Sequence, residues 1–209
     1  MKRSIFALAI FAFSIVAGPA ESVSSPDYAA LNERIFSHLE LLKNKGETAR
    51  AWAGGVTIGL GALTGAGGLL VVSSAASSSD PQMALGLGYG IVALGALVAV
   101  IGIPIIAIPS KSEGTFRKYA AYPGETGDDI KVKAQKGERN FRDLADESKR
   151  DRILGGGIDT AMGIGYILYS GSYYGAFLVG TGLAYLLIDS DPEKEWKIYL
   201  EEKQELARN

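Results

Sequence analysis

The chain has 209 residues, of which 47% are hydrophobic and 21% are charged, with a formal net charge of −2 and no cysteine. This length suits one domain of ordinary size or two small ones. The lack of cysteine excludes disulfide bonds, thiolate metal sites and lipid attachment through cysteine. The nearly balanced charge gives no reason to expect a nucleic-acid partner.

Apolar residues and glycines gather in four segments of the chain. Most of the 27 glycines lie there, and Asp159 is the only charged residue inside these segments. Soluble cores do not exclude charge so sharply, whereas membrane-spanning helices do. We therefore predict an all-α membrane protein with two glycine-rich transmembrane helical hairpins and amphipathic flanking helices. The four predicted spans are residues 52–72, 84–108, 153–170 and 173–188.

The two predicted hairpins, residues 52–108 and 153–188, differ in length. The first two spans have 21 and 25 residues, enough for a bilayer core of about 30 Å. The third and fourth, with 18 and 16 residues, are near the lower limit. The second hairpin therefore spans a thin bilayer, or penetrates most of the way with support from the first.

Residues 1–20 have the layout of a secretory signal peptide. Lys2 and Arg3 precede an apolar run over residues 5–16, and small residues follow up to Ala20. The run is too short to cross a bilayer as a helix, so we expect cleavage after Ala20. An uncleaved anchor is the alternative.

Residues 21–51 contain a predicted amphipathic helix, residues 27–45. Ser25 and Pro26 resemble an N-cap and a first helical position, and Gly46 is placed to end the helix. An apolar stripe follows with three- and four-residue spacing, and it fits either a membrane surface or another soluble element. His38, the only histidine, sits at the edge of this stripe and is expected on the surface. The stripe consists of Tyr28, Leu31, Ile35, Leu39 and Leu42.

The charged segments come after each hairpin. Residues 109–152 hold eleven basic and nine acidic residues, with a turn over residues 122–127 and a helix-forming stretch over residues 141–152. Residues 189–209 are expected to form a charged C-terminal helix after the Ser190-Asp191-Pro192 start.

The two halves of the chain resemble each other. Arg50, which precedes a Gly-Gly pair and the first span, aligns with Arg152 before the third span. After each hairpin a serine, a glutamate and two aromatic residues recur at the same spacing. This second set is Ser110, Glu113, Phe116 and Tyr119 in the first half, and Ser190, Glu193, Trp196 and Tyr199 in the second. Such a duplication predicts a pseudo-symmetric pair of hairpins.

Small residues spaced by four recur within the spans. Helices in lipid associate by close van der Waals contact, so these positions predict helix-packing surfaces. They fit either oligomerisation or, as we favour, packing within and between the hairpins of one chain. The predicted positions are Gly55, Gly59, Gly61, Gly65, Gly86, Gly90, Gly157, Ala161 and Gly165. Over residues 54–68 the pattern resembles exported bacterial proteins of the glycine-zipper type, many of which are lipid-anchored through a cysteine that this chain lacks.

Asp159 lies seven residues into the third span. An ionisable side chain at depth is a functional-site hypothesis. The alternative is structural: seven residues of helix are about 10 Å, and Arg152 lies on roughly the same face, where it can pair with Asp159. We favour this structural pairing, or wetting at the interface, over proton or ion handling.

Signals for orientation conflict with one another. Basic residues flank the spans and are missing from both tips, which places the flanks in the cytoplasm. A cleaved signal peptide places the same flanks outside. We expect an exported protein of a bacterial cell envelope membrane, and the sequence is compatible with either the inner or the outer membrane.

The sequence contains no catalytic constellation, and we expect neither enzyme activity nor a cofactor. The acidic cluster of Asp189, Asp191 and Glu193 lacks the glycine and later glutamate of a calcium loop, so no metal is expected. The leading hypothesis is a structural or assembly scaffold that binds the bilayer and packs on itself or on another membrane protein. A channel or transporter-like pore that uses Asp159 is the alternative.

Overall fold

The structure, a computed structural model, describes residues 27–124, 126–171 and 173–208, and these residues form helices joined by short turns. The all-α prediction is confirmed for this part of the chain. The predicted signal peptide, residues 1–20, lies outside the described residues. In chain order the elements are α1 (Tyr28–Ser74), the 3₁₀ helix η1 (Ala75–Ser77), α2 (Pro81–Ala107), α3 (Lys111–Ala120), α4 (Gly127–Ser170), α5 (Tyr173–Leu187) and α6 (Asp191–Leu206).

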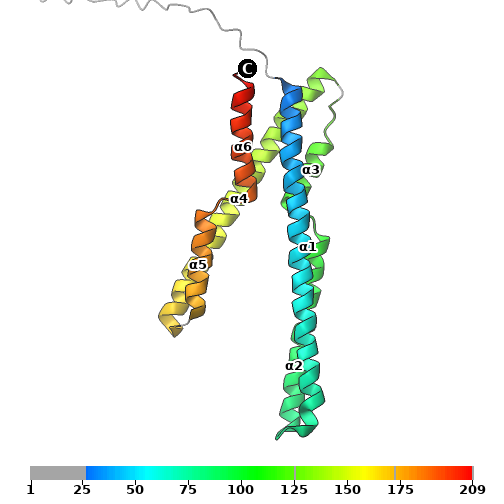
Figure 1. Ribbon diagram of the computed structural model, residues 1–209, viewed down its shortest axis with the longest axis vertical. Coiled ribbons are helices and arrows are strands. Elements are labelled where there is room, and N and C mark those ends of the chain that lie inside the picture. Colours follow the sequence, from blue (N-terminus) through cyan, green and yellow to red (C-terminus); the bar gives the residue numbers. More distant parts are fainter. Residues whose placement is uncertain (1–26, 125, 172, 209) are drawn as a thin grey trace, which may run out of the picture.

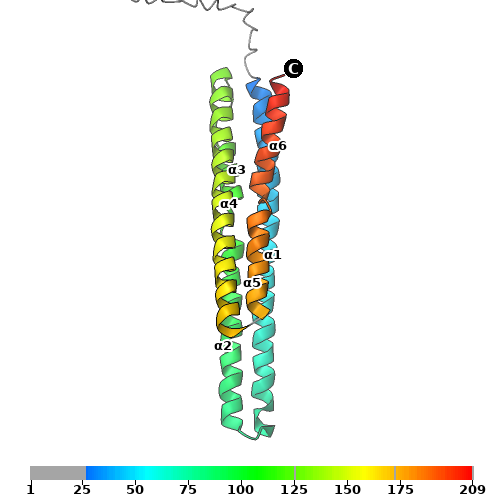
Figure 2. The same ribbon diagram turned by 90° about the vertical axis from the view of Figure 1, so that its left-hand side faces the viewer.

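The molecule has a four-helix head from which two helical hairpins diverge (Figure 1). The head consists of α3, α6 and the N-terminal parts of α1 and α4. The long hairpin pairs the rest of α1, from residue 52, with α2, and the short hairpin pairs the rest of α4, from residue 153, with α5. Both tips point away from the head, and the short hairpin ends well before the long one (Figure 2).

Both long helices run without a break from the head into a hairpin. α1 has 47 residues and α4 has 44. The predicted helix end at Gly46 is therefore wrong, because α1 continues through it. A methyl group at Gly46 would lie 2.5 Å from the Ser110 hydroxyl, so the glycine allows α3 to approach closely instead of ending the helix.

The start of α1 also differs from the prediction. Asp27, and not Ser25, caps the helix, because its side chain accepts hydrogen bonds from the backbone N–H groups two and three residues later at 3.0 and 3.1 Å. An aspartate satisfies the unpaired N–H groups of a first turn as well as a serine does.

The head has its own hydrophobic core. The predicted apolar stripe of α1 faces this core rather than a membrane surface, which settles the choice left open by the sequence. Aromatic rings from α3, α4 and α6 close around it, and Phe141 contacts both Trp196 and Tyr199 at ring-centroid distances of 5.2 and 5.7 Å. The core cluster comprises Ile35, Leu39, Leu42, Tyr119, Phe141, Leu144 and Tyr199.

Two buried tyrosines at matching positions of the repeat differ in their hydrogen bonds. The Tyr119 hydroxyl donates to the backbone oxygen of Asn32 or to its side-chain oxygen, both at 2.9 Å. The buried Tyr199 hydroxyl has no hydrogen-bond partner among the described residues. Burial raises the pKa of Tyr119 to about 12 and that of Tyr199 still further.

We expect opposite effects when each hydroxyl is removed. Tyr119→Phe loses a hydrogen bond and lowers the free energy of unfolding by about 1 kcal/mol. Tyr199→Phe removes a desolvated hydroxyl that gains nothing in return, so it is neutral or stabilising by up to about 1 kcal/mol. Chemical unfolding of both variants, followed by near-UV circular dichroism, measures the difference. A loss of stability in Tyr199→Phe equal to that in Tyr119→Phe would contradict the account.

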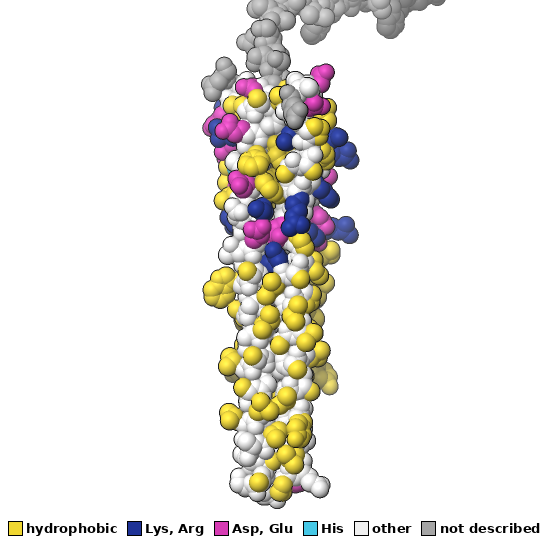
Figure 3. Space-filling view, turned by 90° about the vertical axis from the view of Figure 1, so that its right-hand side faces the viewer, with side chains coloured by type: hydrophobic (Ala, Val, Ile, Leu, Met, Phe, Trp, Pro, Cys, Tyr) yellow, Lys and Arg dark blue, Asp and Glu magenta, His cyan; other side chains and the backbone are white. Residues whose placement is uncertain are grey.

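Charge and apolar surface lie at opposite ends of the molecule. On the face that Figure 3 shows, charged side chains gather over the head, and the surface below them is mostly apolar. Two stretches, Tyr28–Ser77 and Pro81–Ala120, are long and apolar enough to cross a membrane by length and composition. The four predicted spans go beyond this finding, because α5 has only 15 residues.

Candidate functional site

A buried ion pair joins each hairpin to the head. At the base of the long hairpin, Arg50 of α1 donates from Nε and Nη2 to the two carboxylate oxygens of Glu113 on α3, at 3.0 and 3.1 Å. Glu113 also accepts from the backbone N–H of Ser110 at 3.1 Å, which completes a capping box at the start of α3. We call this group the first clamp.

The same arrangement recurs in the short hairpin and forms the second clamp. Arg152 of α4 donates from Nε and Nη2 to Glu193 of α6 at 2.8 and 3.0 Å, and Glu193 accepts from the backbone N–H of Ser190 at 2.8 Å. Arg152 also donates from Nη1 to two backbone carbonyls in the last turn of α5, those of Tyr185 and Leu186, at 2.8 and 2.7 Å. The second clamp therefore ties together three helices.

The clamps explain the repeated residues. The arginine before each hairpin and the glutamate after it form one bidentate pair, so each clamp closes a hairpin at its base. Ser110 and Glu113 of the first clamp occupy the positions that the sequence alignment matches with Ser190 and Glu193. Sequence comparison aligned these residues but did not predict that they bind each other.

Both glutamates are held ionised. Burial alone raises the pKa of Glu193, but the Arg152 guanidinium and the Ser190 backbone N–H outweigh burial and lower that pKa to about 2. Glu113 shows the same balance: burial opposes ionisation, while Ser110 and Arg50 lower its pKa. The pKa of Arg152 is raised by its hydrogen bond to Glu193. Arg152 and Glu193 are therefore both charged at neutral pH.

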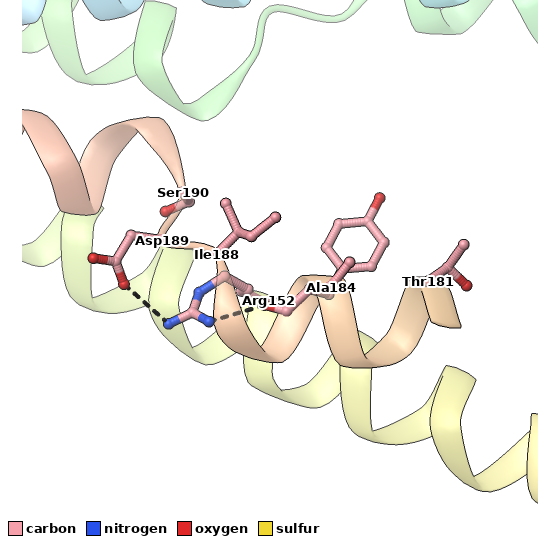
Figure 4. A pocket seen from close by; sticks show the side chains of 7 residues that line it. Arg152, Thr181, Ala184, Ile188, Asp189 and Ser190 are labelled. Atoms are coloured by element: carbon pink, nitrogen blue, oxygen red, sulfur yellow. Dashed lines mark hydrogen bonds and ion pairs between the residues drawn. The ribbon is translucent and has the colours of Figure 1, made fainter. Parts of the chain in front are cut away.

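An open pocket of about 340 Å³ lies beside the second clamp. Figure 4 shows Arg152, Asp189 and Ser190 at one end and Thr181 at the other, with Ala184 and Ile188 between them. The guanidinium of Arg152 is already committed to two carboxylates, Glu193 and Asp189 (3.6 Å), so it has no free charge for an anion. The pocket has the character of an apolar hollow at the base of the hairpin.

Glycines spaced by seven residues form the seam of the long hairpin. In α2 the three buried residues are all glycines, and they face a matching set on α1. Seven residues are close to two helical turns, so such a set lies on one face. A methyl group at Gly95 would lie 2.6 Å from the carbonyl oxygen of Gly61 and would overlap the backbone nitrogen of Gly65. The seam glycines are Gly54, Gly61 and Gly68 of α1 with Gly88, Gly95 and Gly102 of α2.

The short hairpin has the same seam with one layer fewer. Gly156 and Gly163 of α4 face Gly182 and Gly175 of α5, and a methyl group at Gly163 would lie 2.6 Å from the carbonyl oxygen of Gly175. These four glycines match the seam positions nearest the head in the long hairpin. The layer formed there by Gly68 and Gly88 has no counterpart.

Most of the four-spaced positions predicted for packing lie outside these seams. Gly61 is buried in the seam, and the backbone of Gly65 lines it. At the other predicted glycines an added methyl group would meet nothing within 4 Å, and Ala161 is exposed. The seven-residue spacing, which was present in the sequence, identifies the contact within each hairpin. The outward positions are Gly55, Gly59, Gly86, Gly90, Gly157 and Gly165.

Asp159 does not pair with Arg152. Arg152 binds Glu193, Asp189 and two backbone carbonyls instead. Asp159 is partly exposed on α4 and makes no hydrogen bond or ion pair with any residue that the structure describes. The carboxylate of Asp159 is therefore left without a partner inside the described chain.

His38 is buried, so its predicted surface position is wrong. Helix α6 covers it, leaving 8% of the residue exposed. Its Nδ1 lies 2.9 Å from Glu195 and its Nε2 lies 3.4 Å from Glu202, while Lys45 donates to Glu195 at 3.2 Å. Its three- and four-residue spacing from Ile35 and Leu42 was the signal that it faces the core.

These arrangements bind helices to one another. Among the described residues, no three His, Cys, Asp or Glu side chains are grouped to hold a metal ion. The arginine and glutamate of each clamp form an ion pair with each other. Comparison with protein-family models, curated proteins and solved structures finds no match to this chain.

Proposed function

We propose that the protein is a non-enzymatic structural scaffold of the bacterial cell envelope, inserted in a lipid bilayer through both hairpins with its head at one surface. One observation carries this proposal: the hairpins bury glycines and expose large apolar side chains. Leu63 and Leu70 of α1 are each 71% exposed, and Val100 of α2 is 60% exposed. Such a surface is stable in hydrocarbon and costly in water.

The seams support this insertion. Lipid gives two helices no hydrophobic reason to associate, so close backbone contact must hold them together. Glycine seams supply that contact within each hairpin. Away from the helix ends, the backbone N–H and C=O groups of the arms bond to each other within one helix, as a bilayer requires.

Assembly between copies would use the small residues that remain outside the seams. Gly55 and Gly59 of α1 are exposed, and Gly157 and Ala161 form a similar pair of positions on α4. A methyl group added at any of the three glycines would meet nothing within 4 Å, and Ala161 is exposed, so these positions are available to another helix in the membrane.

Cysteine cross-linking in membranes tests this assembly, since the native chain has no cysteine. We expect Gly59→Cys to form dimers on oxidation because a small-residue face permits helix contact. Leu60→Cys, whose leucine is 56% exposed, lies on another face of the same helix and serves as the matched control. Equal cross-linking at both positions, or a strictly monomeric mass in native mass spectrometry, would contradict self-assembly.

A pore is the second candidate, and the unpaired carboxylate of Asp159 is the observation in its favour. An intramembrane carboxylate without an internal partner is typical of ion or proton pathways. Flux of protons or cations into liposomes that is abolished in Asp159→Asn would support the pore. Flux that is absent, or that the substitution leaves unchanged, would remove this candidate.

A further inference from the structure

The two hairpins start at the same level but end at different depths. The clamps fix both bases to the head through equivalent contacts, Arg50 with Glu113 and Arg152 with Glu193. From that level the tip of the short hairpin falls well short of the tip of the long one (Figure 2). A single flat membrane slab therefore cannot fit both hairpins equally well.

Helix lengths give the size of the difference. α2 has 27 residues and α5 has 15, which corresponds to about 18 Å of helix at 1.5 Å per residue. On the other arm α1 continues past its clamp arginine for about six residues more than α4 does, or about 9 Å. One seam layer corresponds to seven residues, or about 10 Å of helix, so the missing glycine layer accounts for most of the difference in hairpin length.

The tip of the short hairpin has the chemistry of a membrane–water interface. Tyr169 and Tyr173, on either side of the turn, are 95% and 94% exposed, and neither hydroxyl bonds to any described residue. Gly171 reverses the chain there with φ 62°. An unpaired phenol is costly in hydrocarbon, whereas tyrosine is favoured at the headgroup level. The tip therefore requires headgroups or water around it.

The long hairpin requires its interface farther out. Its apolar surface continues to Leu70 and Met83, which are 71% and 72% exposed. Only beyond them does the chain become polar, with the serine-rich turn before Asp80. Two interface levels are thus set on one rigidly clamped head.

We propose that the protein thins the bilayer locally: the far interface lies at the serine-rich tip beside the long hairpin and steps inward to Tyr169 and Tyr173 beside the short one. This inference rests on the membrane insertion proposed above. The partner is the lipid itself, because a bilayer adjusts its thickness to the apolar length of a helix. A shortened hairpin clamped to the same head as a full-length one makes that adjustment one-sided.

Tryptophan depth measurements test the step. The full-length protein with Trp196→Phe keeps Trp52 as its single probe, on the head side. Two more proteins carry Trp52→Phe and Trp196→Phe and one new tryptophan each. Leu168→Trp places the probe at the short tip, and Ser77→Trp places it at the long tip. Each protein is reconstituted in phosphatidylcholine vesicles with progressively longer acyl chains. Lipids brominated near the headgroup or near the chain end then quench the probe according to its depth.

We expect all three probes to be quenched at least about twofold more strongly by headgroup-proximal bromine, even in the longest lipid, because each sits at an interface. If chain-end bromine strongly quenches Leu168→Trp while the other two probes remain at an interface, the proposed local thinning is wrong. Membrane insertion of the protein would still hold. Weak quenching of every probe by all lipids would instead overturn insertion, and with it the proposed function.

Removing the tip hydroxyls separates their role from helix length. With Tyr169→Phe and Tyr173→Phe added, we expect the Leu168→Trp probe to move toward chain-end quenching in long lipids. Tyr185→Phe, on the same hairpin but at its head end, should leave the probe unchanged. A probe that does not move in the double phenylalanine variant would show that the tyrosines do not set the interface.

Discussion

Gly95→Ala is expected to destabilise the long hairpin by about 2–3 kcal/mol, although the change adds a single methyl group and favours a helix. The added carbon would overlap the backbone nitrogen of Gly65 and lie 2.6 Å from the carbonyl oxygen of Gly61. Backbone atoms of a helix cannot move aside singly, so the two arms must separate along the seam. Overpacking of this kind typically costs about 1–3 kcal/mol, and the lost contact between the arms places the value at the upper end.

Gly90→Ala is the matched control on the same helix. A methyl group at Gly90 meets nothing within 4 Å, so only the helix propensity changes, and alanine is better than glycine by about 0.5–1 kcal/mol. The two variants should therefore shift stability in opposite directions. Unfolding in mixed detergent with rising SDS, followed by far-UV circular dichroism, measures both, and two shifts of the same sign would refute the seam.

Arg152→Met is expected to have an equally large effect at the base of the short hairpin. It leaves Glu193, which is 6% exposed, as a buried carboxylate without its counter-charge. Breaking one partner of a buried ion pair in this way costs on the order of 3 kcal/mol. Chemical unfolding followed by near-UV circular dichroism of Trp196, which packs against the head core, measures this loss of stability.

Two further variants isolate the charge from the packing. The double variant Arg152→Met/Glu193→Gln removes the unpaired charge and keeps an acceptor for the Ser190 N–H, so it should recover most of the lost stability. Lys111→Met breaks a pair with Glu147 and Asp151 whose side chains are more than half exposed, and it should change little. A double variant less stable than Arg152→Met would contradict this account of the clamp.

The pH dependence of stability follows from the same carboxylate. Glu193 has a pKa of about 2 in the folded protein, below its ordinary value of 4.5. A depressed carboxyl pKa stabilises the fold above the ordinary value, and this contribution is lost as the pH falls from about 4.5 toward about 2. Glu193→Gln should therefore flatten the acid limb of the stability profile in that window.

Much of the fold could be predicted because helix periodicity and charge segregation are local properties of the sequence. The all-α class follows from apolar length and composition, and the apolar stripe of α1 follows from its three- and four-residue spacing. The continuation of α1 through Gly46 could not be predicted in this way. In sequence, a glycine that ends a helix cannot be distinguished from one that makes room for a neighbouring residue such as Ser110. The burial of His38 depended on α6, more than 150 residues away.

Part of the candidate site could be predicted from the sequence. Arg50 and Arg152 stood out through the repeat, but pairing them with Glu113 and Glu193 required knowing that each hairpin brings its two ends together. Four-residue glycine spacing predicts a packing surface, since single membrane helices often associate that way. The long antiparallel arms here use every second turn instead, which selects Gly61 and excludes Gly59.

The unbroken course of α1 and α4 makes each of them a mechanical lever. No hinge residue separates head from hairpin, so a change in how the two helices cross in the head core is carried to the tips as a rotation. About 18 residues separate Arg152 from the end of α4, roughly 27 Å, and a tilt of about 5° there moves the tip by about 2 Å. A change that loosens the contact of α6 with His38 would thus alter the distance between the tips of the two hairpins.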